Sequence, residues 1–321
     1  AGKRRCWCLT WQPEMCGTGL LTRRAVHSVV DMPLHRFDAH TWAHQFHPQL
    51  QALIDPFLGV DAFCMPHNYF LPHPHGGMSA ITLLLDDSPG GVLNRDSLGD
   101  RSTIAPGDLH WTQAGSGIVH EETPSQPGVA AVGLQVFVNM ARTRKQDPAA
   151  VFKVARADMP VWQQAGAKVT VVAGTFQGLA SPLANDPRWA TPVDLLDIRL
   201  ETGATLALPV QSRSNGFLLV LSGGLQANGH AAMAQQAVVL QPAPLPAPAA
   251  EAVAHPASGA GVVTLHAGEA GAHVVLMAGL PLREPVVPHG PFVGNSRDDI
   301  VAYIQAYQAG RMGELAPSLS R

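Results

Sequence analysis

The stretch LPHPHGGMSAITLLLDDSPGG, from Leu71 to Gly91, contains the pattern that decides the fold. An apolar run of strand length lies between turn sequences rich in Gly, Pro and Asp, and similar runs and turns continue from Arg23 to about Met140. Short strands with turns at this spacing are typical of a sandwich or barrel. After a polar stretch at residues 141–152, further strand sequences follow, including VDLLDIRL and GFLLVLSGG. The sequence therefore predicts an all-β protein with two barrels.

The composition supports this fold class and excludes others. The chain has 321 residues, 46% of them hydrophobic, which is enough for two domains or one large one. Its 31 glycines and 27 prolines favour strands joined by tight turns over a helix bundle. The net charge of −3 provides no basic surface for a phosphate backbone, so we expect no direct nucleic-acid binding. No apolar run approaches the ~18 residues of a membrane span, and we expect a cytoplasmic, monomeric protein without membrane contact.

The sequence NSRDDIVAYIQAYQAGRMGEL, near the C-terminus, has a helical pattern. Asn295 or Ser296 can cap the helix, two aspartates lie in its first turn, and apolar residues recur at spacings of three and four from Ile300. Gly310 then ends it. We also expect Trp111, in a segment flanked by turns, to pack inside the first barrel.

Three of the four cysteines, Cys6, Cys8 and Cys16, lie within the first sixteen residues. They could bind zinc, but no fourth ligand stands at a standard finger spacing, so we interpret residues 1–22 as a flexible leader. Only Cys64 lies in the rest of the chain, so no disulfide framework holds the protein.

Two pairs of metal-binding residues stand on candidate strands. His73 and His75 are two residues apart, as are His120 and Glu122, and the alternation of side chains along a strand turns each pair to one face. The turn-rich segments between the pairs could reverse the chain and bring one pair opposite the other. We therefore predict that these four residues hold one metal ion, while Glu121 points away from it.

Three neutral imidazoles and one carboxylate suit a divalent first-row transition metal; iron is our first choice, with manganese, nickel, copper or zinc as alternatives. Four protein ligands leave up to two octahedral positions for substrate or dioxygen. A closed structural zinc site would be richer in thiolates. Because imidazole must be neutral to coordinate, we expect metal affinity to fall as the pH drops through about 6.5. The nearby His67 and His110 are out of phase or distant, and we expect them to support the site or lie at the surface.

The sequence that contains these four residues resembles the pirin family of the bicupin superfamily, from about Arg23 to Gly313. The stretches that carry the resemblance are DPFLGVDAF, the PHPHGG strand, NRDSLGDRSTIAPGDLHWTQAGSGIVHEETP, GLQVFVNM and GPFVGNSRDDI. The resemblance implies two cupin barrels (double-stranded β-helix, or jelly-roll) face to face with a C-terminal helix. It also implies that the first barrel holds the metal through His73, His75, His120 and Glu122.

The chain departs from the family pattern at three positions near the site. Gly76 follows the HPH sequence where the family usually has Arg, Ser79 stands where it usually has Glu, and Asn94 replaces a usual His. The Glu is a metal ligand in other cupins but not in pirins, so no pirin ligand is lost. We expect these changes to alter the mouth or surroundings of the pocket, and with them the choice of substrate.

The predicted organisation follows from these segments. After the leader, residues 23–140 form the N-terminal metal-binding cupin domain, and residues 141–152 form a linker. Residues 153–321 form a C-terminal cupin domain without metal, with an Ala/Pro-rich loop insertion at 241–261 and the C-terminal helix.

The resemblance implies a quercetin 2,3-dioxygenase-type enzyme that opens flavonol-like aromatic substrates with dioxygen. With Glu122 ionised, a divalent ion and its ligands carry a net charge of +1, which favours an enolate ligand, and the resemblance suggests that Glu122 also acts as a catalytic base. Pirins are also described as transcriptional co-regulators or partners of metabolic enzymes. The alternative is therefore a metal- or redox-dependent regulatory protein that binds a protein partner without turnover. A third interpretation is a metal that only rigidifies the barrel.

Overall fold

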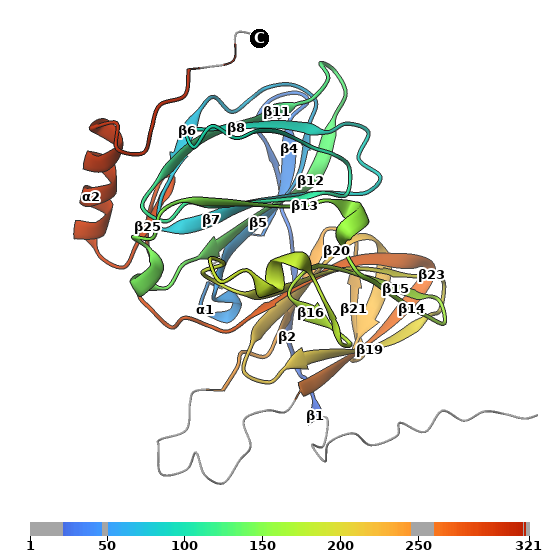
Figure 1. Ribbon diagram of the computed structural model, residues 1–321. Coiled ribbons are helices and arrows are strands. Elements are labelled where there is room, and N and C mark those ends of the chain that lie inside the picture. Colours follow the sequence, from blue (N-terminus) through green and yellow to red (C-terminus); the bar gives the residue numbers. More distant parts are fainter. Residues whose placement is uncertain (1–21, 47–50, 245–259, 317, 319–321) are drawn as a thin grey trace, which may run out of the picture.

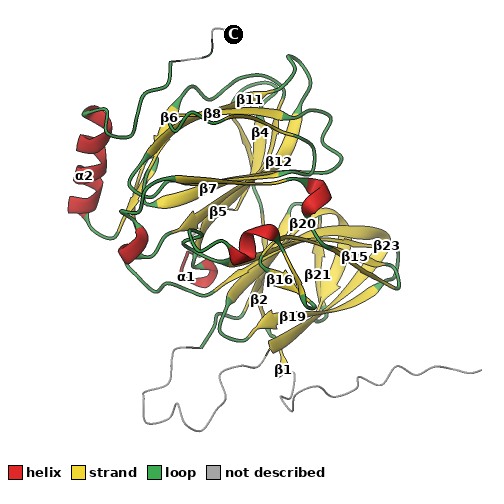
Figure 2. Cartoon of the chain, viewed as in Figure 1, coloured by secondary structure: helices red, strands yellow, loops and turns green. Residues whose placement is uncertain are grey.

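The computed structural model describes residues 22–46, 51–244, 260–316 and 318. Two barrels of β-strands are stacked on one another, and short helices lie at their edges (Figures 1 and 2). The predicted fold, all-β with two barrels and a C-terminal helix, is confirmed. Most of the predicted leader, with Cys6, Cys8 and Cys16, and residues 245–259 of the predicted insertion lie outside the described residues.

The first barrel consists of two sheets. The larger, with strand order β13-β10-β7-β12-β5-β4-β3, contains β3 (Leu34–Arg36), β4 (Trp42–Phe46), β5 (Phe57–Met65), β7 (Met78–Leu84), β10 (Leu109–Gln113), β12 (Ala131–Asn139) and β13 (Ala150–Val154). The smaller, with order β6-β11-β8-β9, contains β6 (His73–His75), β8 (Val92–Asp96), β9 (Arg101–Ile104) and β11 (Ile118–Pro124). The small sheet arches over the large one in Figure 1 and encloses the barrel interior.

The second barrel is formed by one ten-stranded sheet. Its strands are β1 (Thr22–Arg23), β2 (Val26–Asp31), β14 (Val161–Gln164), β15 (Ala167–Ala173), β18 (Val193–Leu200), β19 (Thr205–Gln211), β20 (Asn215–Ala227), β21 (His230–Met233), β22 (Gln236–Leu240) and β23 (Ala260–Gly279). Apolar side chains fill its interior, among them Val169, Leu208, Leu218 and Leu265.

The remaining elements are short. They are the hairpins β16 (Thr175–Phe176) with β17 (Leu179–Ala180) and β24 (Val287–His289) with β25 (Phe292–Gly294), the helices α1 (Gln51–Ile54) and α2 (Arg297–Gln308), and the 3-10 turns Arg142–Arg144, Arg156–Asp158 and Pro182–Asn185. Helix α2 begins as predicted: the Ser296 hydroxyl accepts from the Asp299 backbone N–H, and the Asp299 carboxylate accepts from the Ser296 N–H. In the part of the chain that the structure describes, neither helix is long and apolar enough to cross a bilayer.

Adjacent rows of the seven-stranded sheet have opposite chemistry. The strand register places five buried apolar residues side by side on neighbouring strands: Trp111, Ile81, Val136, Val60 and Phe46. The next row contains polar residues on the same strands: His110, Thr82, Gln135, Asp61 and Gln45. Because side chains alternate along a strand, the two rows face opposite sides of the sheet. The apolar row faces the second barrel, and the polar row faces the interior of the first.

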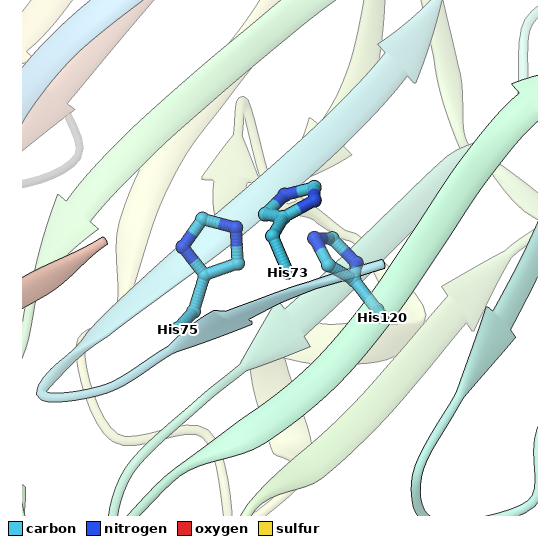
Figure 3. A group of neighbouring side chains, drawn as sticks. All are labelled: His73, His75 and His120. Atoms are coloured by element: carbon cyan, nitrogen blue, oxygen red, sulfur yellow. The ribbon is translucent and has the colours of Figure 1, made fainter. Parts of the chain in front are cut away.

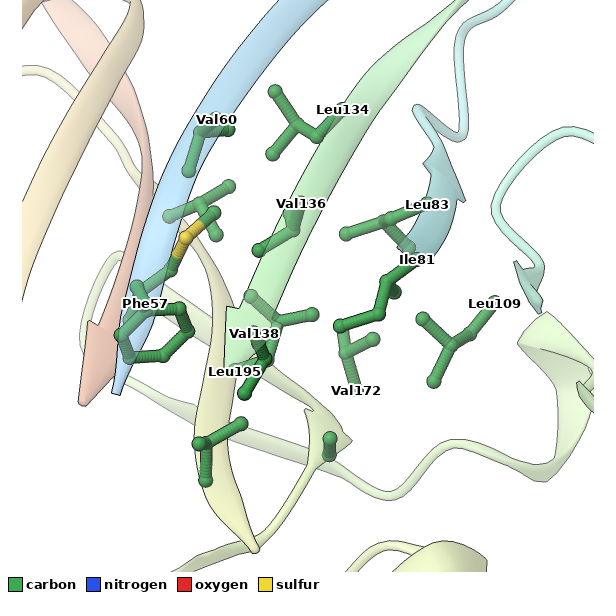
Figure 4. Packing of buried hydrophobic residues seen from close by; sticks show 14 of the residues in the cluster. Phe57, Val60, Ile81, Leu83, Leu109, Leu134, Val136, Val138, Val172 and Leu195 are labelled. Carbon is green, nitrogen blue, oxygen red and sulfur yellow. The ribbon is translucent and has the colours of Figure 1, made fainter. Parts of the chain in front are cut away.

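The apolar row belongs to a continuous core between the two barrels. Figure 4 shows side chains of β5, β7 and β12 packed near Val172 and Leu195 of the second barrel. Trp111 also lies in this core, with its ring 5.3 Å from that of Trp189 and perpendicular to it. The prediction that Trp111 packs inside the first barrel is therefore wrong, because its strand neighbour His110 occupies the interior face.

Each end of the described chain packs on the barrel formed by the other half. Strand β2 pairs with β22 and β1 pairs with β23, so residues 22–31 belong to the second sheet and not to the predicted N-terminal domain. At the other end, Phe292 pairs with Gly76 and α2 packs beside the first barrel. An open strand edge forms hydrogen bonds with a strand that lies beside it in space, and that strand need not be close in sequence.

The predicted linker is also part of the first barrel. Residues 150–154 form β13, which pairs with β10. Lys145 is buried, and its Nζ donates to the Gly77 carbonyl and to Asn139 Oδ1, both at 2.6 Å. These hydrogen bonds compensate for burial of the amine and tie the segment to the turn that follows the HPH sequence.

Candidate metal centre

Three of the four predicted ligands meet on one face of the small sheet. The antiparallel pairing of β6 with β11 places His120 directly opposite His73 and Ile118 opposite His75. The three imidazole centroids are 4.8 to 5.0 Å apart, and one nitrogen from each ring lies within 4.8 Å of the others. Figure 3 shows the three rings gathered on the same side of their strands. The predicted chain reversal between the two motifs is thus present.

The histidines are in the chemical state that a metal requires. Burial lowers the pKa of His73, of His75 to about 3, and of His120 well below its ordinary value, so all three rings are neutral near pH 7. His73 Nδ1 donates to the Leu71 carbonyl at 2.8 Å, which leaves a lone pair on Nε2. The Nδ1 atoms of His75 and His120 are buried without a hydrogen-bond partner among the described residues. Three neutral, crowded imidazoles could hold a transition-metal ion.

Glu122 lines the same cavity, but in this structure its carboxylate is bound elsewhere. Among the described residues, only the three histidines, and not Glu122, form a group whose potential metal-ligating atoms all lie within 4.8 Å of one another. The Thr82 hydroxyl donates to Glu122 Oε2 at 2.6 Å, and His110 Nδ1 lies 3.8 Å from Oε1. Burial raises the pKa of the Glu122 carboxyl to about 7, although the Thr82 hydrogen bond opposes this shift. Glu121 pairs with Arg95 and faces away, as its alternation on the strand predicts.

Behind Glu122 lies a buried polar group that includes His110, one of the two histidines that we expected to support the site or lie at the surface. His110 is 1% exposed, and burial lowers its pKa to about 4. Its Nε2 is 3.7 Å from Asp100 Oδ2, and Asn94 donates to the same oxygen at 3.1 Å. His110 therefore supports the site, whereas His67 is exposed and its Nε2 lies 2.9 Å from Asp38 Oδ2. Asn94, one of the departures from the family pattern, is part of this supporting group.

The other two departures have different structural consequences. A Cβ on Gly76 would lie 2.8 Å from the Tyr303 ring, so the packing of α2 leaves no room for the usual arginine. Ser79 lies directly beside Val138, on the sheet face that packs against the second barrel. Ser79 is therefore not at the mouth of the pocket, which is one of the two places where we expected the three changes to act.

A cavity of about 200 Å³ extends from the histidines across the large sheet. Its lining includes residues at every second position along β4, β5 and β12, counting Thr41 just before β4: Thr41, Ala43 and Gln45; Asp61, Phe63 and Met65; Gln135 and Phe137. Phe37 and Phe70, from two loops, complete the lining. Sequence reasoning missed these residues, because alternation identifies them only once it is known which face of each strand points inward.

Comparisons with known proteins agree with this architecture. A family model described as Pirin matches residues 24–138, and one described as Pirin C-terminal cupin domain matches residues 195–313. Pirin-like protein 2 of Arabidopsis thaliana is 33% identical over 265 residues, covering 82% of this chain and 77% of its own length. A Pseudomonas aeruginosa protein with the provisional name quercetin 2,3-dioxygenase is 34% identical, covering 80% of this chain and 86% of its own length.

Two solved structures show the same fold. The quercetin 2,3-dioxygenase of Acinetobacter baumannii superimposes with a TM-score of 0.77 at 22% identity, covering 92% of this chain and 100% of that one. A bacterial pirin of Escherichia coli in complex with nickel(II) has a TM-score of 0.57 at 14% identity, covering 79% and 99% of the two chains.

Proposed function

Since this chain belongs to the pirin family of bicupins, we propose that it is a metal-dependent dioxygenase that opens flavonol-like substrates, as quercetin 2,3-dioxygenases do. The observation that carries the proposal is the placement of three neutral histidines and a buried carboxylate at one end of an aromatic-lined cavity. A related protein and a solved neighbour bear the name of this activity. Open cavities with a few convergent polar groups are where small molecules bind.

His73, His75 and His120 would hold the metal, and we propose Glu122 as the fourth ligand. A divalent transition metal bound there would supply electrostatic stabilisation of an anionic substrate oxygen and redox chemistry with dioxygen. Because the three imidazoles are neutral, Glu122 is the one ligand that brings negative charge. The site then keeps a net positive charge that favours a deprotonated hydroxyl.

Glu122 would also remove the proton from the substrate hydroxyl. The Thr82 hydroxyl holds Oε2, and Glu122 lines the cavity, so we propose its carboxylate as the acceptor for this proton. Without metal, burial raises the pKa of the carboxyl to about 7. A bound cation would favour the ionised carboxylate, which is the form that accepts a proton. The aromatic lining excludes water from the deprotonated substrate.

Metal affinity should depend on pH through Glu122 and not through the histidines. The pKa of Glu122 is raised to about 7, so its ionised form increases as the pH rises, whereas the lowered pKa values of the histidines keep them neutral. We expect affinity for Ni²⁺ to rise about tenfold per pH unit below 7 and to level off above it. Chelator competition between pH 5.5 and 8.5 measures this. In Glu122→Gln the profile should be flat; an unchanged rise in that variant would place the proton competition on the imidazoles, as the sequence alone predicted.

Turnover tests the proposed activity directly. Metal-free protein would be loaded separately with iron, manganese, nickel or copper and supplied with quercetin and dioxygen. We expect at least one metal to give dioxygen uptake equal to the quercetin consumed, and Glu122→Gln to lower the rate by about 10²–10⁴-fold, the usual contribution of general base catalysis. Metal binding and quercetin binding without turnover for any metal would contradict the enzyme and favour the regulatory alternative.

A further inference from the structure

Two of the three clustered histidines, His73 and His75, stand on a short strand at the edge of its sheet. Strand β6 has only three residues, and among the described residues β11 is its one neighbour in the small sheet. A metal site needs its ligands held in fixed relative positions by the surrounding structure. The geometry of the three imidazoles therefore depends on what fixes the free edge of β6 and the turn that follows it.

The segment before helix α2 covers this free edge. The Val293 backbone N–H donates to the Gly76 carbonyl at 3.0 Å, and the Gly76 N–H donates to the Pro291 carbonyl at 3.3 Å. Burial, and next the neighbouring His73, lower the pKa of His75, and the Pro291 carbonyl opposes this shift. Residues 291–293 thus form a short neighbour to the ligand strand, and one of their carbonyls also acts on the His75 ring.

Gly77, two residues after His75, is held through both of its backbone polar groups. Its N–H donates to the Gly115 carbonyl at 2.8 Å, and its carbonyl accepts from Lys145 Nζ at 2.6 Å. Its φ of +75° lies in the left-handed region that favours glycine, so the chain turns sharply at this point. The turn between β6 and β7 is therefore fixed by two other segments, the turn before β11 and the 3-10 region at Lys145.

Tyr303 of α2 connects these two segments. Helix α2 lies at the end of the first barrel that carries β6 and β25 (Figure 1). The Tyr303 side chain is buried, its hydroxyl donates to the Lys145 carbonyl at 3.0 Å, and the Gly115 carbonyl is 3.4 Å away. Its ring stacks on Phe292, with centroids 5.6 Å apart and 13° between the planes. One side chain of the C-terminal helix therefore contacts every segment that holds the turn after His75.

We propose that Tyr303 and Lys145 are positioning residues of the metal centre, which fix the turn at Gly77 and thereby place His75 relative to the other two histidines. The inference rests on the proposed metal site and not on the dioxygenase activity. Partners that orient a metal ligand typically contribute 10–100-fold to metal affinity. Because Tyr303 and Lys145 act on the backbone beside the ligand and not on its ring, we expect an effect near the lower end of this range.

The test removes one polar group at a time from the full-length protein and keeps the bulk of each side chain. Tyr303→Phe retains the ring against Phe292 without the hydroxyl, and Lys145→Met retains an apolar stem without the amine. In chelator competition we expect each variant to bind Ni²⁺ about tenfold more weakly than the unmodified protein. The visible spectrum of the Co²⁺-loaded protein, which reports coordination geometry, should change in the same variants. Tyr303→Phe decides the outcome if Lys145→Met fails to fold.

Two controls separate positioning from stability. Tyr307→Phe removes the hydroxyl of an exposed tyrosine on the same helix. Ser88→Ala removes a buried hydroxyl that donates to the Gly90 carbonyl at 2.7 Å, outside the cavity. Both controls should keep the Ni²⁺ affinity and the Co²⁺ spectrum of the unmodified protein, even where Ser88→Ala lowers the thermal midpoint.

The outcomes distinguish this role from the proposed function. An unchanged affinity and spectrum in Tyr303→Phe, or an equal loss of affinity in Ser88→Ala, would overturn the positioning role while leaving the metal site intact. Failure of the unmodified protein to bind Ni²⁺ would contradict the metal site and this role together. Weaker Ni²⁺ binding and a changed Co²⁺ spectrum in Tyr303→Phe support the role whether or not the protein turns over quercetin.

Discussion

His120→Ala should fold but lose its metal. The side chain is one of three imidazoles that share a single site, and it directly faces His73 across paired strands. Removing a supporting hydrogen bond to a ligand already costs 10–100-fold in metal affinity, so removal of the ligand itself should cost more than about 100-fold. We expect elemental analysis to find no bound metal after dialysis and quercetin turnover to be absent. The thermal midpoint should shift only modestly, because Val119 and Glu121 keep the strand alternation.

His273→Ala provides the matched control. His273 is another buried histidine, on β23 of the second barrel, where its Nε2 lies 3.0 Å from Asp197 Oδ1. Its loss should destabilise the fold without changing metal content. Full turnover by His120→Ala would show that the reaction does not use this site. If that variant instead unfolds at ambient temperature, the metal site has a structural role.

Trp111→Ala should have the largest effect on stability. The ring is fully buried in the core between the barrels and contacts Trp189 edge to face. A cavity of this size in a core that both barrels share costs about 3–5 kcal/mol of unfolding free energy. Urea denaturation of the metal-free and metal-loaded protein measures this loss. The folded fraction should bind metal normally, because Trp111 points away from the metal cavity.

Trp162→Ala tests whether the position of Trp111 matters and not only its size. Trp162 is half-buried on β14 and contacts Phe176 edge to face at 5.5 Å. It lies outside the core between the barrels, so its removal should cost clearly less. If both variants lose the same unfolding free energy, burial in the core between the barrels contributes no more to stability than packing elsewhere in the protein.

The sequence was informative where chemistry follows local spacing. The two-residue intervals between His73 and His75 and between His120 and Glu122 place each pair on one strand face, and turn sequences between them permit the reversal that pairs β6 with β11. The C-terminal helix was also predictable, since its cap and apolar spacing lie within one short segment. The alternation of side chains along the strand also predicted that Glu121 points to the opposite face of the sheet from His120 and Glu122.

Local spacing could not predict on which barrel each end of the described chain packs. Nothing in residues 26–31 indicates that they pair with β22, more than two hundred residues later. Nor does the helix pattern show that Tyr303 packs over Gly76. Pairing between distant segments depends on which edges remain open after both barrels form.

The sequence by itself therefore determined the fold class, the three histidines and the alternating faces of each strand. The tertiary structure decided which face points inward, and with it the opposite positions of Trp111 and His110, the hydrogen bond from Thr82 to Glu122 and the polar row ending at Asp61. The physical reason is the range of the interactions. Alternation is a property of neighbouring peptide units. The register across the five strands of the polar row, and the choice of the face that packs on the second barrel, result from contacts between residues far apart in the chain.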